Sequence, residues 1–140
     1  MEKINAQKKL LREYFSKQTD ILMAFIFGSY AKGRALVESD VDIAVYFKPQ
    51  NQQVEWEIDK KYADESQIWL EVERIVKKNV DLLVLNRAFS TVAFEVLRTG
   101  VPIIIKDRRL YLRFFSRVSF EAMDFMEMAD DYWAIEERSG

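Results

Sequence analysis

The chain has 140 residues, of which 49% are hydrophobic and 14% aromatic, and a net charge of -2 at pH 7. It contains no cysteine and no histidine, which excludes disulfides, cysteine zinc sites and catalysis through a thiolate or an imidazole. Any chemistry must therefore use carboxylates, hydroxyls, lysine, arginine or a bound cation.

Length and composition predict one folded domain that spans residues 1–140. The acidic balance argues against a dedicated nucleic-acid-binding protein. No apolar run is long enough to cross a membrane, and the charged start, Met1 to Ile4, is unlike a signal peptide. The default expectation is a cytoplasmic protein.

The first elements are a helix and two strands. Apolar residues recur with a helical period between residues 3 and 18, which predicts an amphipathic helix. The apolar run Ile21 to Phe27 predicts a strand that ends at the turn Gly28-Ser29. Asp40 opens a second strand, which we expect to run to about residue 47.

The turn between these strands has the composition of an anion site. After Gly28-Ser29, residues 30–34 are long enough for about one helical turn. Backbone N–H groups left free there could cradle a phosphate. The side chains of Ser29, Lys32 and Arg34 would add a hydroxyl and positive charge.

The second strand begins with two carboxylates. Asp40 and Asp42 are two residues apart, so their side chains share one face of the strand. Val41, Ile43 and Val45 then point to the opposite face, into the core. Neighbouring carboxylates repel unless a cation lies between them, and hard oxygen ligands suit Mg²⁺ or Mn²⁺. The structural alternative is a polar turn followed by a strand with an acidic edge.

The middle of the chain adds helices and a third carboxylate. Residues 54–78 predict a broken helical segment, in which Trp56 and Trp69 are expected to pack in a core or against a partner rather than on a nucleobase. Residues 80–85 predict a third strand, with Asp81 at its beginning. If this strand lies beside the second one, Asp81 joins the acidic pair. Otherwise it is a solvated aspartate at a strand edge.

A fourth strand and a long helical segment complete the chain. Residues 88–98 predict a helix ended by Gly100, and 101–106 predict an edge strand because Pro102 is near its start. Residues 108–137 predict a long helix or a helix pair with an apolar seam, whose first half could equally pack on the protein's own sheet.

Methionines, aromatic residues and acids crowd the second half of this segment. This composition favours a surface for a basic partner protein, with Phe125, Met126 and Trp133 as candidate contacts. At its start, Arg109, Arg113 and Arg117 share one helical face. These arginines form a solvated basic face, or they contact phosphates or a partner.

Gly28-Ser29, followed after ten residues by Asp40-x-Asp42, resembles the signature of the nucleotidyltransferase superfamily that includes polymerase beta. In size the chain is similar to the minimal nucleotidyltransferases, and it most resembles the MntA-type antitoxins that are paired with HEPN-domain toxins. The resemblance implies an α+β (α/β-like) fold, with a small mixed sheet of about four strands flanked by helices and a long C-terminal helical segment.

The resemblance also implies roles for individual residues. Asp40, Asp42 and Asp81 would be the catalytic carboxylates and would hold two Mg²⁺ ions, for which Mn²⁺ could substitute. Gly28 and Ser29 would hold the phosphates of ATP. Many relatives carry arginine where this chain has Lys32, and lysine cannot form the same bidentate contact.

The implied reaction is the transfer of AMP from ATP onto a tyrosine of a cognate HEPN-domain ribonuclease toxin, in a hetero-oligomeric complex. The added phosphate would obstruct RNA binding by the toxin. Two alternatives remain. The chain could be a non-catalytic antitoxin that acts by binding alone, or an enzyme with a small-molecule acceptor, although such enzymes usually add a C-terminal helical domain.

Overall fold

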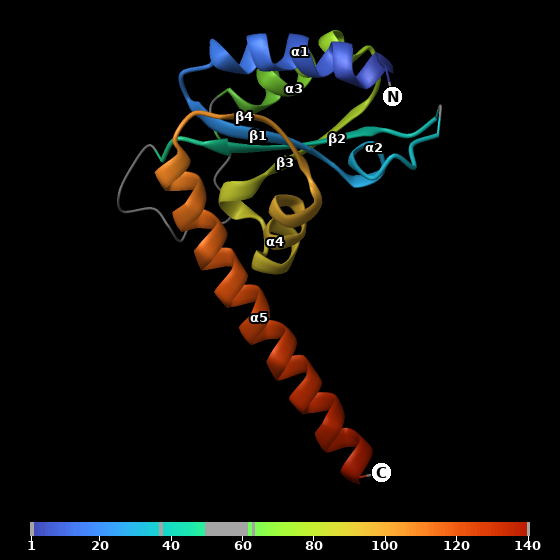
Figure 1. Cartoon of the computed structure of the whole chain (residues 1–140), viewed down its shortest axis with the longest axis vertical. Coiled ribbons are helices and arrows are strands. Elements are labelled where there is room, and N and C mark those ends of the chain that lie inside the picture. Colours follow the sequence, from blue (N-terminus) through green and yellow to red (C-terminus); the bar gives the residue numbers. More distant parts are fainter. Residues whose placement is uncertain (1, 37, 50–61, 63, 140) are drawn as a thin grey trace.

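The computed structural model describes residues 2–36, 38–49, 62 and 64–139, which form a sheet between two layers of helices (Figure 1). Helices α1 (Glu2–Ser16) and α3 (Glu65–Val76) cover one face, and α4 (Ser90–Thr99) and α5 (Arg108–Ser139) lie on the other. The remaining elements are the strands β1 (Ile21–Phe27), β2 (Val41–Phe47), β3 (Val80–Val84) and β4 (Val101–Ile105), and the short helices α2 (Gly28–Ala31) and η1 (Leu85–Arg87).

The four strands form a mixed sheet in the order β3-β2-β1-β4. Strand β1 is antiparallel to β2 and β4, whereas β2 and β3 are parallel. The parallel pair requires a crossover connection, which contains α3. This arrangement confirms the expected α+β fold, and it confirms that the strand with Pro102 is an edge strand.

The face under α1 and α3 carries the larger core. Val41, Ile43 and Val45 point to this side, as their alternation along β2 predicts. They pack against side chains of both helices, including Leu11, Phe15, Ile68, Val72 and Val76. Trp69 packs against the same cluster and donates a hydrogen bond from Nε1 to the Val80 carbonyl at 2.7 Å. Its expected packing role is confirmed, whereas Trp56 lies outside the described residues.

The opposite face is covered by α4 and the first half of α5. Met23, Phe25 and Ala44 from the sheet pack there with Phe114 and Val118 of α5. The C-terminal segment, expected as one helix or two, is a single helix whose first half packs on the protein's own sheet. Its second half extends past α4, away from the sheet (Figure 1). No described helix combines the length and apolar character needed to span a bilayer.

Gly100 caps α4 as predicted, but not through a left-handed conformation. Its φ is -74°, in the extended region, and its N–H donates to the Val96 carbonyl at 2.7 Å. A Cβ on this residue would lie 2.4 Å from the Val96 oxygen and 3.1 Å from the Ile26 oxygen. The position needs glycine because two backbones approach it closely, where the sequence had predicted an ordinary helix cap.

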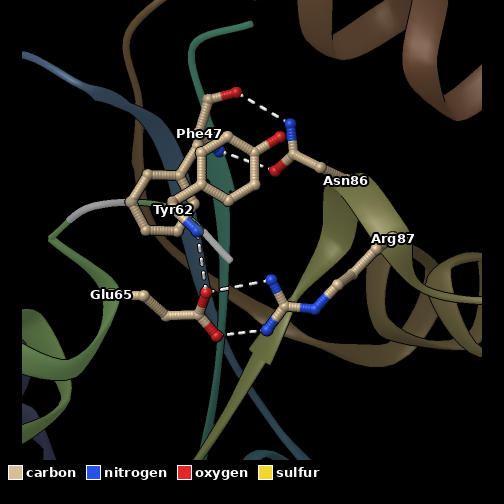
Figure 2. Close-up of polar contacts among 5 residues, drawn as sticks. All are labelled: Phe47, Tyr62, Glu65, Asn86 and Arg87. Carbon is tan, nitrogen blue, oxygen red and sulfur yellow. Dashed lines mark hydrogen bonds and ion pairs between the residues drawn. The ribbon is translucent and has the colours of Figure 1, made fainter. Parts of the chain in front are cut away.

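A polar cluster joins the start of α3 to the end of β3 (Figure 2). Glu65, which is 3% exposed, accepts two hydrogen bonds from the Arg87 guanidinium, one of them 2.9 Å long. The neighbouring Asn86 brackets Phe47, accepting from its N–H and donating to its carbonyl, both at 2.8 Å. The Phe47 and Tyr62 rings stack next to these hydrogen bonds, with their centroids 4.5 Å apart. The cluster therefore fixes the far end of β2 against the crossover connection.

We expect Arg87→Ala to lower the free energy of unfolding by about 3 kcal/mol, because it leaves a buried carboxylate without its counter-charge. Arg98→Ala is the matched control, since Arg98 pairs with Glu95 where both side chains are about half exposed, 55% and 48%. That change should cost less than about 1 kcal/mol. Denaturant unfolding of both variants measures the difference, and equal costs would contradict the structural role given to the Glu65–Arg87 pair.

Candidate active site

The candidate site lies at one end of the sheet, where three strands bring their residues into a row. Asp42 is paired with Phe27 of β1 on one side and with Asp81 of β3 on the other. Asp42 and Asp81 occupy the same strand faces as Ala44 and Leu83, which pack toward α4 and α5. Asp81 therefore lies beside Asp42, as predicted from the pairing of the two strands, whereas Asp40, predicted to open β2, lies outside it. Asp40 immediately precedes β2 and is exposed.

The turn after β1 touches the Asp42 carboxylate directly. Gly28 begins the one-turn helix α2 and has a φ of 72°, which an L side chain rarely adopts. A Cβ at Gly28 would lie 2.1 Å from Oδ2 of Asp42. The predicted phosphate turn and the predicted acidic strand are thus in contact, and glycine is what permits that contact.

Burial and neighbouring charge act together on Asp42. Burial raises the pKa of this carboxyl above its ordinary value of 3.8, and the charges of Asp81 and then Asp40 raise the pKa further. The three carboxylates are therefore close enough to interact. Their hard oxygen atoms, and the repulsion among them, fit a divalent cation such as Mg²⁺. Within the described residues, however, no three acidic side chains converge closely enough to enclose a metal ion.

The predicted basic residues of the turn are on the surface. Lys32 and Arg34 are both exposed, and neither forms an ion pair within the described part of the chain. The backbone of the turn is tight, because the Arg34 N–H donates to the Ser29 carbonyl at 2.9 Å. A hydrogen bond from Arg98 lowers the pKa of Glu95 in α4, and the charge of Lys32 also lowers that pKa. Phosphate binding by Lys32 and Arg34 stays a prediction.

Lys78 was missed as a candidate site residue. It donates a hydrogen bond from Nζ to the Tyr30 hydroxyl at 2.6 Å, which ties the start of β3 to α2. With Asp40, Leu70 and Arg74, it lines an open hollow of about 610 Å³ at the edge of the site. The sequence had assigned Lys78 to a helix end. Its position three residues before Asp81 was the signal that could have placed it near the carboxylates.

The predicted partner residues lie on the half of α5 that follows Ala122 and extends away from the sheet (Figure 1), which we call the free half. Phe125 and Met126 are 62% and 48% exposed, and they follow Ala122, which is fully buried. The side chain of Trp133 lies outside the described residues. The described pair therefore lies where α5 leaves the domain, and its role in binding a partner stays a prediction.

Comparison with known proteins identifies a family. Residues 9–109, more than half of the chain, match the family model described as Polymerase beta, Nucleotidyltransferase. This range contains all of the predicted catalytic and phosphate-binding residues. No curated protein sequence gives a significant match to the chain.

Several solved structures share the fold. A chain from a crystal structure of a toxin-antitoxin with AMP-PNP is 18% identical, with a TM-score of 0.63 and coverage of 96% of this chain and 98% of that one. A chain from the toxin-antitoxin MntA-HepT is 16% identical, with a TM-score of 0.57 and coverage of 96% and 97%. A chain from a tri-AMPylated Shewanella oneidensis HEPN toxin in complex with MNT antitoxin is 16% identical, with a TM-score of 0.57 and coverage of 95% and 99%.

Asp42→Asn should stabilise the protein at neutral pH, by about 1 kcal/mol. The folded state raises the pKa of Asp42, so this group's contribution to stability falls as pH rises from 3.8 through the raised pKa. Asparagine cannot ionise, and the gain should vanish below about pH 3, where Asp42 is mostly protonated in both states. Thermal unfolding across pH in metal-free buffer measures this, with Asp64→Asn at an exposed position as control. A gain independent of pH would contradict the electrostatic cause.

Gly28→Ala should cost more than the same change at Gly33. Both glycines have a positive φ, 72° and 69°, so alanine adds similar backbone strain of about 1–2 kcal/mol at each. Only the change at Gly28 is expected to push the Asp42 carboxylate aside as well. Thermal unfolding of the two variants compares them, and equal losses of stability would show that the contact with Asp42 relaxes without cost.

Proposed function

The chain belongs to the polymerase beta nucleotidyltransferase family, and we propose on that basis that it transfers AMP from ATP onto a tyrosine of a HEPN-domain toxin. The modification would neutralise the toxin, which makes this chain an antitoxin. The observation that carries the proposal is the contact between Gly28 and Asp42, in register with Asp81. It joins a phosphate-binding turn to a cation-binding strand at one end of the sheet.

Asp40, Asp42 and Asp81 are the proposed ligands for two Mg²⁺ ions, or for Mn²⁺ in their place. When bound, such ions neutralise the triphosphate and lower the pKa of the attacking hydroxyl. The raised pKa of Asp42 supports this assignment, because a carboxylate held near two like charges gains most from a cation. Closing the carboxylates around an ion requires movement of exposed side chains, and both Asp40 and Asp81 are exposed.

In the proposed reaction, the tyrosine oxygen attacks the α-phosphorus of ATP and pyrophosphate leaves along the line of attack. The tyrosine proton passes to a carboxylate, for which Asp81 is the proposed acceptor. The backbone at Gly28 and the hydroxyl of Ser29 would hold the β- and γ-phosphates, and Lys32 and Arg34 would add charge. The chain positions the reacting groups and forms no covalent bond itself.

A partner protein fits the position of the free half of α5. Asp42 and Asp81 share strand faces with residues that pack toward α4 and α5, and α5 extends on that same side of the sheet (Figure 1). A toxin bound at Phe125, Met126 and Trp133 would lie on the side to which the carboxylates belong. The acidic residues of this half would attract a basic partner. The toxin-antitoxin complexes of similar fold support this choice of partner.

The same exposed helix also favours the second candidate, a non-catalytic antitoxin that neutralises its toxin by binding through Phe125 and Met126 alone. A transferase with a small-molecule acceptor is the weaker alternative, because it leaves the exposed Phe125 and Met126 without a partner.

Transfer of label from ATP labelled at the α-phosphate tests the proposal. The purified chain is mixed with Mg²⁺ and the HEPN-domain protein encoded beside it, and labelled toxin is expected. Asp40→Ala combined with Asp42→Ala should reduce labelling by at least about 10³-fold, because removing both ligands removes the cation site. Label at the γ-phosphate should not be transferred.

Two controls separate the candidates. Asp64→Ala, at an exposed aspartate away from the row of carboxylates, should leave labelling unchanged. Phe125→Ser combined with Met126→Ser should weaken the complex with the toxin while keeping the carboxylates intact. A stable complex that is never labelled, and a toxin still neutralised by the double aspartate variant, would refute transfer and favour neutralisation by binding.

A further inference from the structure

One exposed face of α5 carries two blocks of opposite charge. Its members are spaced by steps of three and four, which places them on one side of the helix. We call it the charge-segregated face, and it consists of Arg109, Arg113, Arg117, Phe120, Asp124, Glu127 and Asp131, all of them exposed. Phe120, at the boundary of the blocks, is 70% exposed. It lies about 160° around the helix from buried Val118 and Ala122, so this face points away from the domain.

This charge arrangement does not stabilise α5 itself. Like charges follow one another at spacings of three and four within each block, which is unfavourable on a single helix. Arg109 lies in the first turn of α5, at the positive end of the helix dipole, where a cation is unfavourable. Among the described residues, Arg117 alone of the six charged members forms an ion pair, with Glu121 at 3.9 Å.

The face is complementary to itself when reversed. Arg113 and Glu127 are each seven residues from Phe120, and Arg109 and Asp131 are each eleven residues from it. An antiparallel copy of α5, related by a two-fold axis at Phe120, would therefore present its acidic block to the basic block of the first copy. Arg109 and Arg113 then lie opposite Asp131 and Glu127 of the other copy, and Arg117 lies within one residue of its Asp124.

We propose that α5 pairs antiparallel with α5 of a second copy of this chain, through the charge-segregated face. The two Phe120 rings meet at the two-fold axis and lose their exposure to water. The paired span, residues 109–131, is about 33 Å long. Each domain packs on the far side of its own α5, so the two domains lie on opposite sides of the pair.

This pairing does not depend on the proposed nucleotidyl transfer. The carboxylates and the turn at Gly28 lie at the end of the sheet away from the start of α5. None of these residues is a member of the charge-segregated face. Phe125 and Met126 are about 120–140° around the helix from Phe120. A toxin and a second copy could therefore occupy α5 at the same time.

Charge reversal provides the test, with the full chain in sedimentation velocity at several concentrations. The wild type should dimerise, and its dissociation constant should rise at least about tenfold between about 50 mM and 500 mM salt. Arg109→Glu with Arg113→Glu leaves Arg117 as the only basic member of the face, and Glu127→Arg with Asp131→Arg leaves Asp124 as its only acidic member. Each variant alone should be monomeric, whereas an equimolar mixture should dimerise.

Lys9→Glu with Lys17→Glu is the matched control, because it changes the net charge as much as the first variant does, at exposed positions outside α5. It should dimerise like the wild type. Circular dichroism confirms that each variant folds, and the mixture tests the pairing even if one variant is less stable. A monomeric wild type at every salt concentration would overturn the proposal, as would a dimer that both charge-reversed variants still form.

Discussion

The pairing of β2 with a strand on each side is the constraint on which the candidate site depends. Its antiparallel register with β1 sets Asp42 opposite Phe27, and its parallel register with β3 sets the same residue opposite Asp81. A shift of one residue would turn Asp42 into the core under α1 and α3, where a charge is costly. The apolar residues Val41, Ile43 and Val45 prevent that shift because they fill that core. Burial of one face of the strand therefore holds the carboxylates on the other.

The sequence predicts features that local chemistry determines. The apolar run from Ile21 to Phe27, the glycine at the turn and the alternation after Asp40 each carry their own signal, and all three correspond to the observed elements. Features set by contacts between distant segments carry no such signal. The buried Glu65 and its partner Arg87 are 22 residues apart, and nothing local marks either of them. Gly100 resembles an ordinary helix cap until β1 is seen beside it.

The same distinction applies to the candidate site. Asp81 could be placed because a single residue interrupts an apolar strand, and strand pairing then confirmed its neighbourhood. Lys78 could have been placed near Asp81 by its position in the chain. Its contact with Tyr30 could not be predicted, because it spans 48 residues and forms only when α2 and β3 are both in position. The composition of α5 separated its two halves, but its apolar seam alone did not, since the seam has the same spacing whether the helix packs throughout its length or leaves the domain halfway.

The strand order has a consequence for the growing chain. Contacts between residues far apart in sequence form late, and parallel pairing requires the whole crossover to be present first. Asp42 meets Asp81 only after the crossover with α3 has been made, and β1 gains its second neighbour only when Ile105 reaches Met23. When the first two strands have left the ribosome, the phosphate turn and Asp42 are already exposed, but Asp81, the third carboxylate, has not yet joined them. The site is therefore assembled only after the crossover and β3 have been made, together with the sheet that supports it.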